Sequence, residues 1–313
     1  MFASLPPLDD AVRAAYLERL GVEAAPPSVE SMYAVVRRHA ERVPYETMWI
    51  QSGELWGIDP SDSARRIALG GRGGYCYHLN GALGLLLHSL GYDVQGHVGG
   101  VQVAAGPEPG AVGNHLVLTV TGLPGASNPS GAWYVDTGLG DALHEPLPLA
   151  AGTYVQGPFR MGLERVDDTG WHLTHDPAGG FSGMSWTTGR ARRADFEERH
   201  AWLSTSPESG FVQVPMAERR DATGVDVVRG LVLMRIGADA FTDEPVTSKQ
   251  AWFDLLADLF GLHFEASPPG ARDRLWDCVL TAHRRWEAAR ERAHPVVEAR
   301  PAPAPGRVGQ SGL

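Results

Sequence analysis

A cysteine preceded by a cluster of glycines is the residue of this sequence best suited to covalent chemistry. Cys76 follows a glycine-rich stretch at residues 70–74, and the spacing of apolar residues over 79–90 predicts a helix directly after it. A thiol in the first turn of a helix lies near the positive end of the helix dipole and near free backbone N–H groups, which favour the thiolate and can stabilise an oxyanion. Position alone leaves a second interpretation open, in which Cys76 is a small buried core residue.

A thiolate nucleophile needs a base and a group that orients the base. His115 opens a strand predicted over residues 115–121, and Asp136 closes a strand predicted over residues 133–136. If the two strands pair as a hairpin, the imidazole and the carboxylate become neighbours, with the other ring nitrogen free to face Cys76. Taken singly, the histidine also fits a core or strand-edge position, and the aspartate fits the start of a turn before glycine.

The spacing of apolar residues, which predicts the elements that must position these side chains, changes along the chain. Helical spacing dominates the first ninety or so residues, and alternation with a period of two begins near residue 93, between turns rich in glycine and proline. This change predicts an antiparallel sheet or small barrel after the helices. Short strands are expected between Pro146 and Pro215. Near the end, Ser248 and Gly261 fit the two caps of a helix.

Composition excludes several classes of protein. The 313 residues carry 37 acidic and 27 basic side chains, a net charge of −10, and Lys249 is the only lysine, which argues against a nucleic-acid-binding surface. No apolar run approaches the roughly 18 residues of a membrane span, and the start lacks signal-peptide features, so a cytoplasmic protein is expected. Two cysteines are too few for a disulfide framework or a thiolate metal site. Cys278 fits a packing position in an amphipathic helix.

Several ordered motifs resemble those of the arylamine N-acetyltransferase family and span nearly the whole chain. The family's arginine-glycine-glycine-x-cysteine motif matches Arg72–Cys76, its trailing asparagine matches Asn80, and its catalytic histidine before an apolar strand matches His115. The other matches are the first-helix element at residues 16–21, the proline-aromatic-glutamate element at 44–46, the valine-aspartate-x-glycine-x-glycine element at 135–140 with proline-leucine at 146–147, and the serine-proline-x-x-x-phenylalanine stretch at 206–211.

The resemblance implies an α+β fold with a cysteine-protease-like arrangement of three domains. A helical domain at residues 1–92 would carry the nucleophile, and an antiparallel β-barrel domain at residues 93–210 would carry the histidine and the aspartate. An α/β lid would follow at residues 211–293. The proline-rich remainder, residues 294–313, is expected to be a flexible tail.

The resemblance also implies a ping-pong N-acyltransferase. Cys76 would take an acetyl or acyl group from coenzyme A as a thioester and pass it to an amine, hydrazine or hydroxylamine. Acetyl-CoA or another acyl-CoA would be a co-substrate, with no permanently bound cofactor. Glu46 would form a structural salt bridge with Arg72. By analogy, coenzyme would border Gly138 and Gly140, and the acceptor pocket would be lined by Tyr45, Leu139 and Phe211.

Three positions depart from the family pattern. His78 stands where a glutamate is usual, Leu139 replaces the aromatic residue of the glycine-x-glycine loop, and Thr47 replaces an asparagine. The loss of an aromatic wall keeps open an amide synthase that takes its acyl chain from a carrier protein. Two further interpretations stay open, namely a cysteine hydrolase with the same triad and a family member that only binds a ligand.

Overall fold

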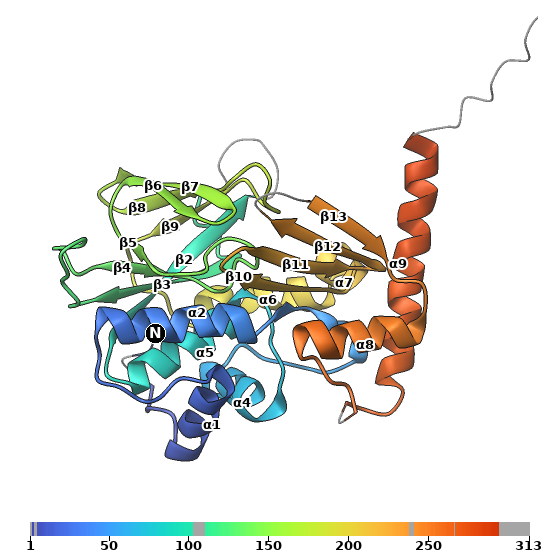
Figure 1. Ribbon diagram of the computed structural model, residues 1–313, viewed down its shortest axis with the longest axis horizontal. Coiled ribbons are helices and arrows are strands. Elements are labelled where there is room, and N and C mark those ends of the chain that lie inside the picture. Colours follow the sequence, from blue (N-terminus) through green and yellow to red (C-terminus); the bar gives the residue numbers. More distant parts are fainter. Residues whose placement is uncertain (1, 3–4, 103–109, 238–240, 266, 294–313) are drawn as a thin grey trace, which may run out of the picture.

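The first ninety residues of the protein are mainly helical. The structure, a computed structural model, describes residues 2, 5–102, 110–237, 241–265 and 267–293 (Figure 1). The tail expected at residues 294–313 lies outside them. The first segment contains α1 (Asp10–Leu20), α2 (Val29–Arg42), β1 (Tyr45–Glu46), α3 (Met48–Ser52), α4 (Pro60–Gly70) and α5 (Cys76–Ser89).

Helix α5 is the central element of this segment. All of its residues from Cys76 to Leu87 are buried, as an apolar sequence on every face of a helix requires. The helix packs against α4 on one side and against the strands β2 and β3 on the other. In Figure 1 it lies below the sheet to which these strands belong. Cys76 therefore begins a helix that packs against other elements on several sides.

An antiparallel sheet of eight strands follows and forms a nearly closed barrel. Its spatial order is β5-β4-β3-β2-β9-β8-β7-β6, and every described pairing is antiparallel. The strands are β2 (Asp93–Gln102), β3 (His115–Thr121), β4 (Trp133–Val135), β5 (Leu147–Pro148), β6 (Gly152–Gln156), β7 (Phe159–Asp167), β8 (Gly170–Thr174) and β9 (Gly183–Thr187). This sheet confirms the prediction, made from the alternation of apolar residues that begins near residue 93, of an antiparallel sheet or barrel after the helices.

The last segment is a second antiparallel sheet with two helices, and it includes a strand from the first segment. The sheet order is β1-β10-β11-β12-β13, so the short strand Tyr45–Glu46 is paired with a strand about 170 residues later. The new elements are β10 (Met216–Asp221), β11 (Gly224–Arg229), β12 (Val232–Gly237), β13 (Phe241–Pro245), α8 (Lys249–Phe260) and α9 (Ala271–Ala293). Ser248 and Gly261 cap α8, as the sequence predicts.

The prediction of short strands between Pro146 and Pro215 is wrong for the end of that range. Residues 194–205 form the helix α6 (Ala194–Thr205), and α7 (Gly210–Gln213) follows. Only Phe196 and Leu203 of α6 are buried, so the helix has too few apolar positions to show a helical period. Among the helices that the structure describes, none is long and apolar enough to cross a membrane.

Candidate active site

Cys76 occupies the first position of α5, as the sequence predicts. Tyr75 is the N-cap residue and has extended backbone, so the thiol stands in the first turn of the helix. The cysteine is 4 % exposed, and its Sγ lies 3.6 Å from the backbone oxygen of Asn114. Cys278 lies far along the sequence in α9 and is partly buried, and burial raises the pKa of its thiol.

The predicted hairpin brings His115 and Asp136 together. Strands β3 and β4 pair with Leu118 opposite Val135, so Asp136 lies beside the first residues of β3. His115 Nε2 and Asp136 Oδ2 are 2.7 Å apart, and both side chains are buried. This leaves Nδ1 of the imidazole for Cys76. The geometry is that of a nucleophile, a base and an orienting carboxylate.

The electrostatics of His115 favour its charged form. Burial opposes protonation, but the charge and hydrogen bond of Asp136, together with the Cys76 side chain, outweigh it and raise the pKa of His115 to about 10. An imidazolium at neutral pH stabilises a neighbouring thiolate. The imidazolium can therefore hold a proton for a leaving group.

Asn80 is a residue of the site that the sequence identifies only as part of a motif. Its Nδ2 donates to Asp136 Oδ1 and to the backbone oxygen of Leu116, each at 2.7 Å, and its Oδ1 accepts from the backbone of Thr137 at 3.0 Å. The signal for this role is its spacing, because a residue four positions after Cys76 lies on the same face of α5. Asn80 links the helix of the nucleophile to the strand pair of the base.

Two more groups fix the Asp136 carboxylate. The backbone N–H of Gly138 donates to Oδ1 at 2.9 Å, and the Tyr134 hydroxyl donates to Oδ2 at 3.0 Å. The carboxylate is thus satisfied at both oxygens although it is buried. Its orientation is set before any substrate binds.

The glycines at 138 and 140 let this loop approach the nucleophile and β10. A Cβ atom on Gly138 would lie 2.8 Å from Cα of Cys76. Gly140 has φ +75°, and a Cβ there would overlap Oε2 of Glu218. A side chain at either position would collide with its neighbour. The loop expected to border coenzyme is therefore packed directly against Cys76.

The predicted salt bridge between Glu46 and Arg72 is present and is part of a larger network. Arg72 Nη2 lies 3.0 Å from Glu46 Oε1, and Nη1 lies 2.8 Å from Glu54 Oε1. The guanidinium also stacks over Trp56 and Phe264 at 4.8 and 4.9 Å. The Glu54 carboxylate comes from a loop whose sequence shows no pattern that would predict this contact. The network anchors the glycine-rich run that leads into Cys76.

His78 replaces the family glutamate as a capping residue. Its Nδ1 accepts a hydrogen bond from the Tyr75 backbone at 3.3 Å, the bond that a glutamate at this third helical position makes in a capping box. The ring is buried in edge contact with Trp49 and Trp56, and burial lowers its pKa well below the ordinary value. The substitution therefore keeps the helix start and puts a neutral ring where a charge is usual.

Two of the three expected acceptor-pocket residues are close together. The rings of Tyr45 and Phe211 meet edge to face with centroids 6.2 Å apart, and Phe211 lies 5.3 Å from the ring of Tyr75. Leu139 packs in the apolar interior of the barrel, in a cluster that includes Tyr134.

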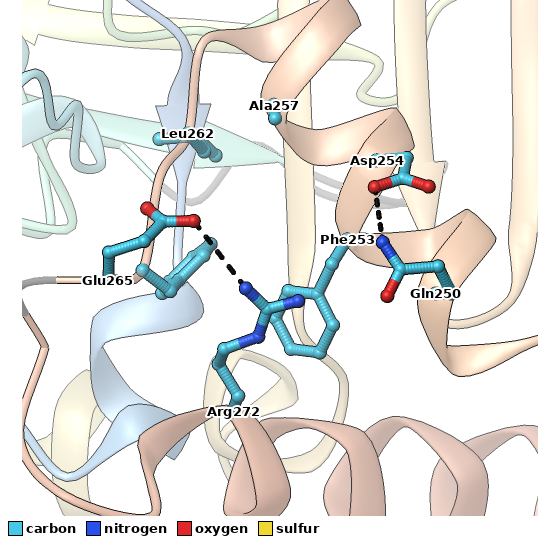
Figure 2. Close-up of a pocket in the computed structure, with 8 residues that line it drawn as sticks. Gln250, Phe253, Asp254, Ala257, Leu262, Glu265 and Arg272 are labelled. Atoms are coloured by element: carbon cyan, nitrogen blue, oxygen red, sulfur yellow. Dashed lines mark hydrogen bonds and ion pairs between the residues drawn. The ribbon is translucent and has the colours of Figure 1, made fainter.

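A pocket of about 140 Å³ opens between α8 and α9, away from Cys76, His115 and Asp136 (Figure 2). Arg272 stacks over Phe253 at 4.1 Å and lies 3.5 Å from Glu265, so its cation is already paired. The lining contains none of the triad or the expected binding residues; it consists of Gln250, Phe253, Asp254, Ala257, Leu262, Phe264, Glu265 and Arg272. Within the described residues, no group of three or more His, Cys, Asp or Glu side chains is arranged to hold a metal ion.

Comparison with known proteins gives one consistent family. A family model described as N-acetyltransferase matches residues 28–268. The arylamine N-acetyltransferase of Mycolicibacterium smegmatis is 32 % identical over 209 residues, which cover 63 % of this chain and 72 % of that protein. An uncharacterized acetyltransferase of Bacillus subtilis is 26 % identical over 213 residues, covering 66 % and 81 %.

Solved structures agree with the sequence relatives. The M. smegmatis arylamine N-acetyltransferase structure superposes with a TM-score of 0.74 at 26 % identity and covers 84 % of this chain and 97 % of its own. The Mycobacterium marinum enzyme in complex with CoA gives a TM-score of 0.75 at 25 % identity, covering 86 % and 98 %. These similarities bear out the three-part α+β fold expected from the motifs.

Proposed function

Because this chain belongs to the arylamine N-acetyltransferase family, whose members are acetyl-CoA-dependent transferases, we propose that it transfers an acetyl group through a Cys76 thioester. The observation that carries the proposal is the position of His115, which bonds to Asp136 through Nε2 and has Nδ1 left for Cys76. The proposed catalytic residues are therefore Cys76 as nucleophile, His115 as acid and base, and Asp136 as the group that orients the imidazole.

The first half-reaction acetylates the enzyme. The Cys76 thiolate attacks the carbonyl carbon of acetyl-CoA, and backbone N–H groups in the first turn of α5, where Cys76 stands, would donate to the oxyanion. The bond between that carbon and the coenzyme sulfur breaks. The departing thiolate takes the proton of His115, whose raised pKa makes it charged at neutral pH.

The second half-reaction releases the product. The acceptor nitrogen attacks the Cys76 thioester, its proton moves to His115, and the bond between the carbonyl carbon and Sγ breaks. The products are an amide and the starting thiolate–imidazolium pair. An amine, hydrazine or hydroxylamine nitrogen can act as the acceptor, because each is a nucleophile that carries a proton to lose.

Three of the proposed binding residues, Gly138, Tyr45 and Phe211, have contacts that support their roles. Gly138 packs against Cys76 and so is the part of the loop that a bound thioester would meet. Tyr45 and Phe211 form an aromatic pair beside Tyr75, suited to an apolar acceptor. The proposed coenzyme-binding residues are Gly138 and Gly140, and the proposed acceptor-binding residues are Tyr45, Leu139 and Phe211.

The named relatives favour acetyl transfer from coenzyme A over a carrier-protein donor or hydrolysis. Those named above are acetyltransferases, and the M. marinum structure is a complex with CoA, so coenzyme A is a better-supported donor here than a carrier protein. A hydrolase would cleave peptides without coenzyme. Hydrolysis has no observation in its favour, and a carrier-protein donor has only the replacement of an aromatic residue by Leu139.

Mass spectrometry of the intact protein tests the proposal. After incubation with acetyl-CoA, the wild type should gain the mass of one acetyl group, and Cys76→Ala should gain none. Cys278→Ala serves as the matched control and should be acetylated as the wild type is, because Cys278 lies in α9. Equal acetylation of Cys76→Ala would contradict the assignment of the nucleophile.

A further inference from the structure

Glu218 lies one strand beyond Tyr45 from the loop that carries Cys76, and it has no part in the chemistry above. Gly74, two residues before Cys76, forms a parallel bridge with Tyr45, and Tyr45 pairs with Glu218 across β1 and β10. Neighbouring strands are about 4.8 Å apart, so the Glu218 backbone is roughly 10 Å from the loop that carries the cysteine. Tyr45 lies between them.

The side chain of Glu218 reaches the glycine loop. A Cβ on Gly140 would overlap Glu218 Oε2, which means that the carboxylate rests against the backbone of Gly140. Gly138, two residues earlier, packs against Cys76. The carboxylate therefore stands where β1, β10 and the loop meet, beside the proposed acceptor-binding residue Tyr45.

This carboxylate has no partner. Glu218 is partly buried, and in the described part of the chain no side chain or backbone group forms a hydrogen bond or ion pair with it. The titratable and charged groups that face it are Tyr45 on β1, Asp141 after the loop and Arg229 on β11. Burial and the negative charge of Asp141 raise the pKa of Glu218 to about 8, and the charge of Arg229 opposes this rise.

We propose that Glu218 determines acceptor specificity by binding a positively charged group, so that the preferred acceptors are amines that carry a second, basic nitrogen. The inference rests on the proposed function. An unpaired carboxylate that is partly removed from water is costly, and a cation placed against it recovers that cost. The acetyl thioester has no positive charge to offer, whereas an amine acceptor can carry one. The rings of Tyr45 and Phe211 would hold the apolar part of such an acceptor.

Two acceptors of the same shape test the proposal. In 4-(aminomethyl)aniline a protonated aminomethyl group stands where 4-ethylaniline has an ethyl group, and the charge persists up to about pH 8. The quantity measured is the ratio of kcat/KM for the two acceptors, with acetyl-CoA as donor. The variants are Glu218→Gln, which removes the charge at constant shape, and the control Glu244→Gln on β13, where the glutamate is exposed.

The wild type and Glu244→Gln should prefer the charged acceptor by about tenfold at pH 8, and Glu218→Gln should reduce the ratio to about one. In the wild type the ratio should also rise from pH 6 to pH 8 as Glu218 ionises. An unchanged ratio in Glu218→Gln, or a wild-type ratio that is flat with pH, would overturn the proposal; the wild-type pH series decides it even if the variant does not fold. A wild type that fails to acetylate Cys76 contradicts the proposed function itself, whereas normal acetylation with an unchanged ratio contradicts only the role of Glu218.

Discussion

The carboxamide of Asn80 holds the carboxylate of Asp136 at 2.7 Å from a position one helical turn beyond Cys76. One side chain thus connects the element that carries the nucleophile to the element that orients the base. The same carboxamide bonds to the backbone of Leu116 and Thr137. We conclude that Asn80, together with packing, sets the relative position of helix α5 and the β3–β4 hairpin.

Replacing Asn80 by alanine should therefore lower kcat by a large factor, whereas the free energy of unfolding should change by comparatively little. Loss of the bond lets Asp136 and His115 shift, and a displacement of about 1 Å at a catalytic group can cost about 100-fold in rate. Steady-state kinetics with an arylamine and acetyl-CoA measure the effect. Asn128→Ala is the control, because Asn128 bonds to Ala132 in a distant loop and should lower stability by about 1 kcal/mol while leaving kcat unchanged. Equal rates for the two variants would show that Asn80 has no positioning role.

The raised pKa of His115 predicts how stability responds to alkaline pH. The folded protein holds this proton up to about pH 10, whereas the unfolded chain loses it near the ordinary histidine value of about 6.5. The stabilisation is thus complete below about pH 6.5 and is lost as pH rises toward 10. Asp136→Asn removes the cause of the shift. In urea denaturation, the stability difference between wild type and variant should shrink from pH 7 to pH 10, and a constant difference would contradict the assignment.

The lowered pKa of His78 predicts a second effect of pH on stability, a loss of stability at acid pH. Burial depresses its pKa in the folded state, so below about pH 6.5 the unfolded chain binds a proton that the folded protein does not. His78 therefore contributes to loss of stability as pH falls. His78→Gln keeps an acceptor for the Tyr75 backbone and has no such proton to bind. Thermal unfolding between pH 7 and pH 5 should show a smaller loss of Tm for the variant, and parallel curves would show that His78 is not buried in the neutral form.

The contact between Gly138 and Cys76 predicts that alanine at 138 is harmful. Its Cβ would meet the cysteine backbone at 2.8 Å and force the loop or α5 to move, at a cost of about 1–3 kcal/mol in stability. The acetylation of Cys76 in a single turnover should slow strongly. Gly57→Ala is the matched control, since no atom lies within 4 Å of a Cβ there. Normal acetylation by Gly138→Ala would mean that the loop is not part of the site.

The positions of the three proposed catalytic residues can be predicted from the sequence, because local patterns show where each stands on its helix or strand. Cys76 starts the helix that the apolar spacing predicts, His115 begins one strand of the hairpin, and Asp136 directly follows the other. The capping residues of α8 follow from the same kind of local rule.

The contacts that sequence analysis misses join residues far apart in the chain. The pairing of Tyr45 with Glu218 spans two segments, and a two-residue strand has no detectable period. The Glu54 carboxylate on Arg72 comes from an irregular loop. Such partners are chosen by packing of whole elements, so their identity requires the three-dimensional structure.

Transfer from the isolated acetyl-enzyme tests the central claim most directly. The protein is acetylated with acetyl-CoA, freed of coenzyme on a desalting column, and mixed with an arylamine. Cys278→Ala, treated in the same way, is the control. The account predicts that the mass of the acetyl group leaves Cys76 and appears in an equal amount of amide without added coenzyme. An acetyl group that remains on the protein, or leaves only as acetate, would contradict it.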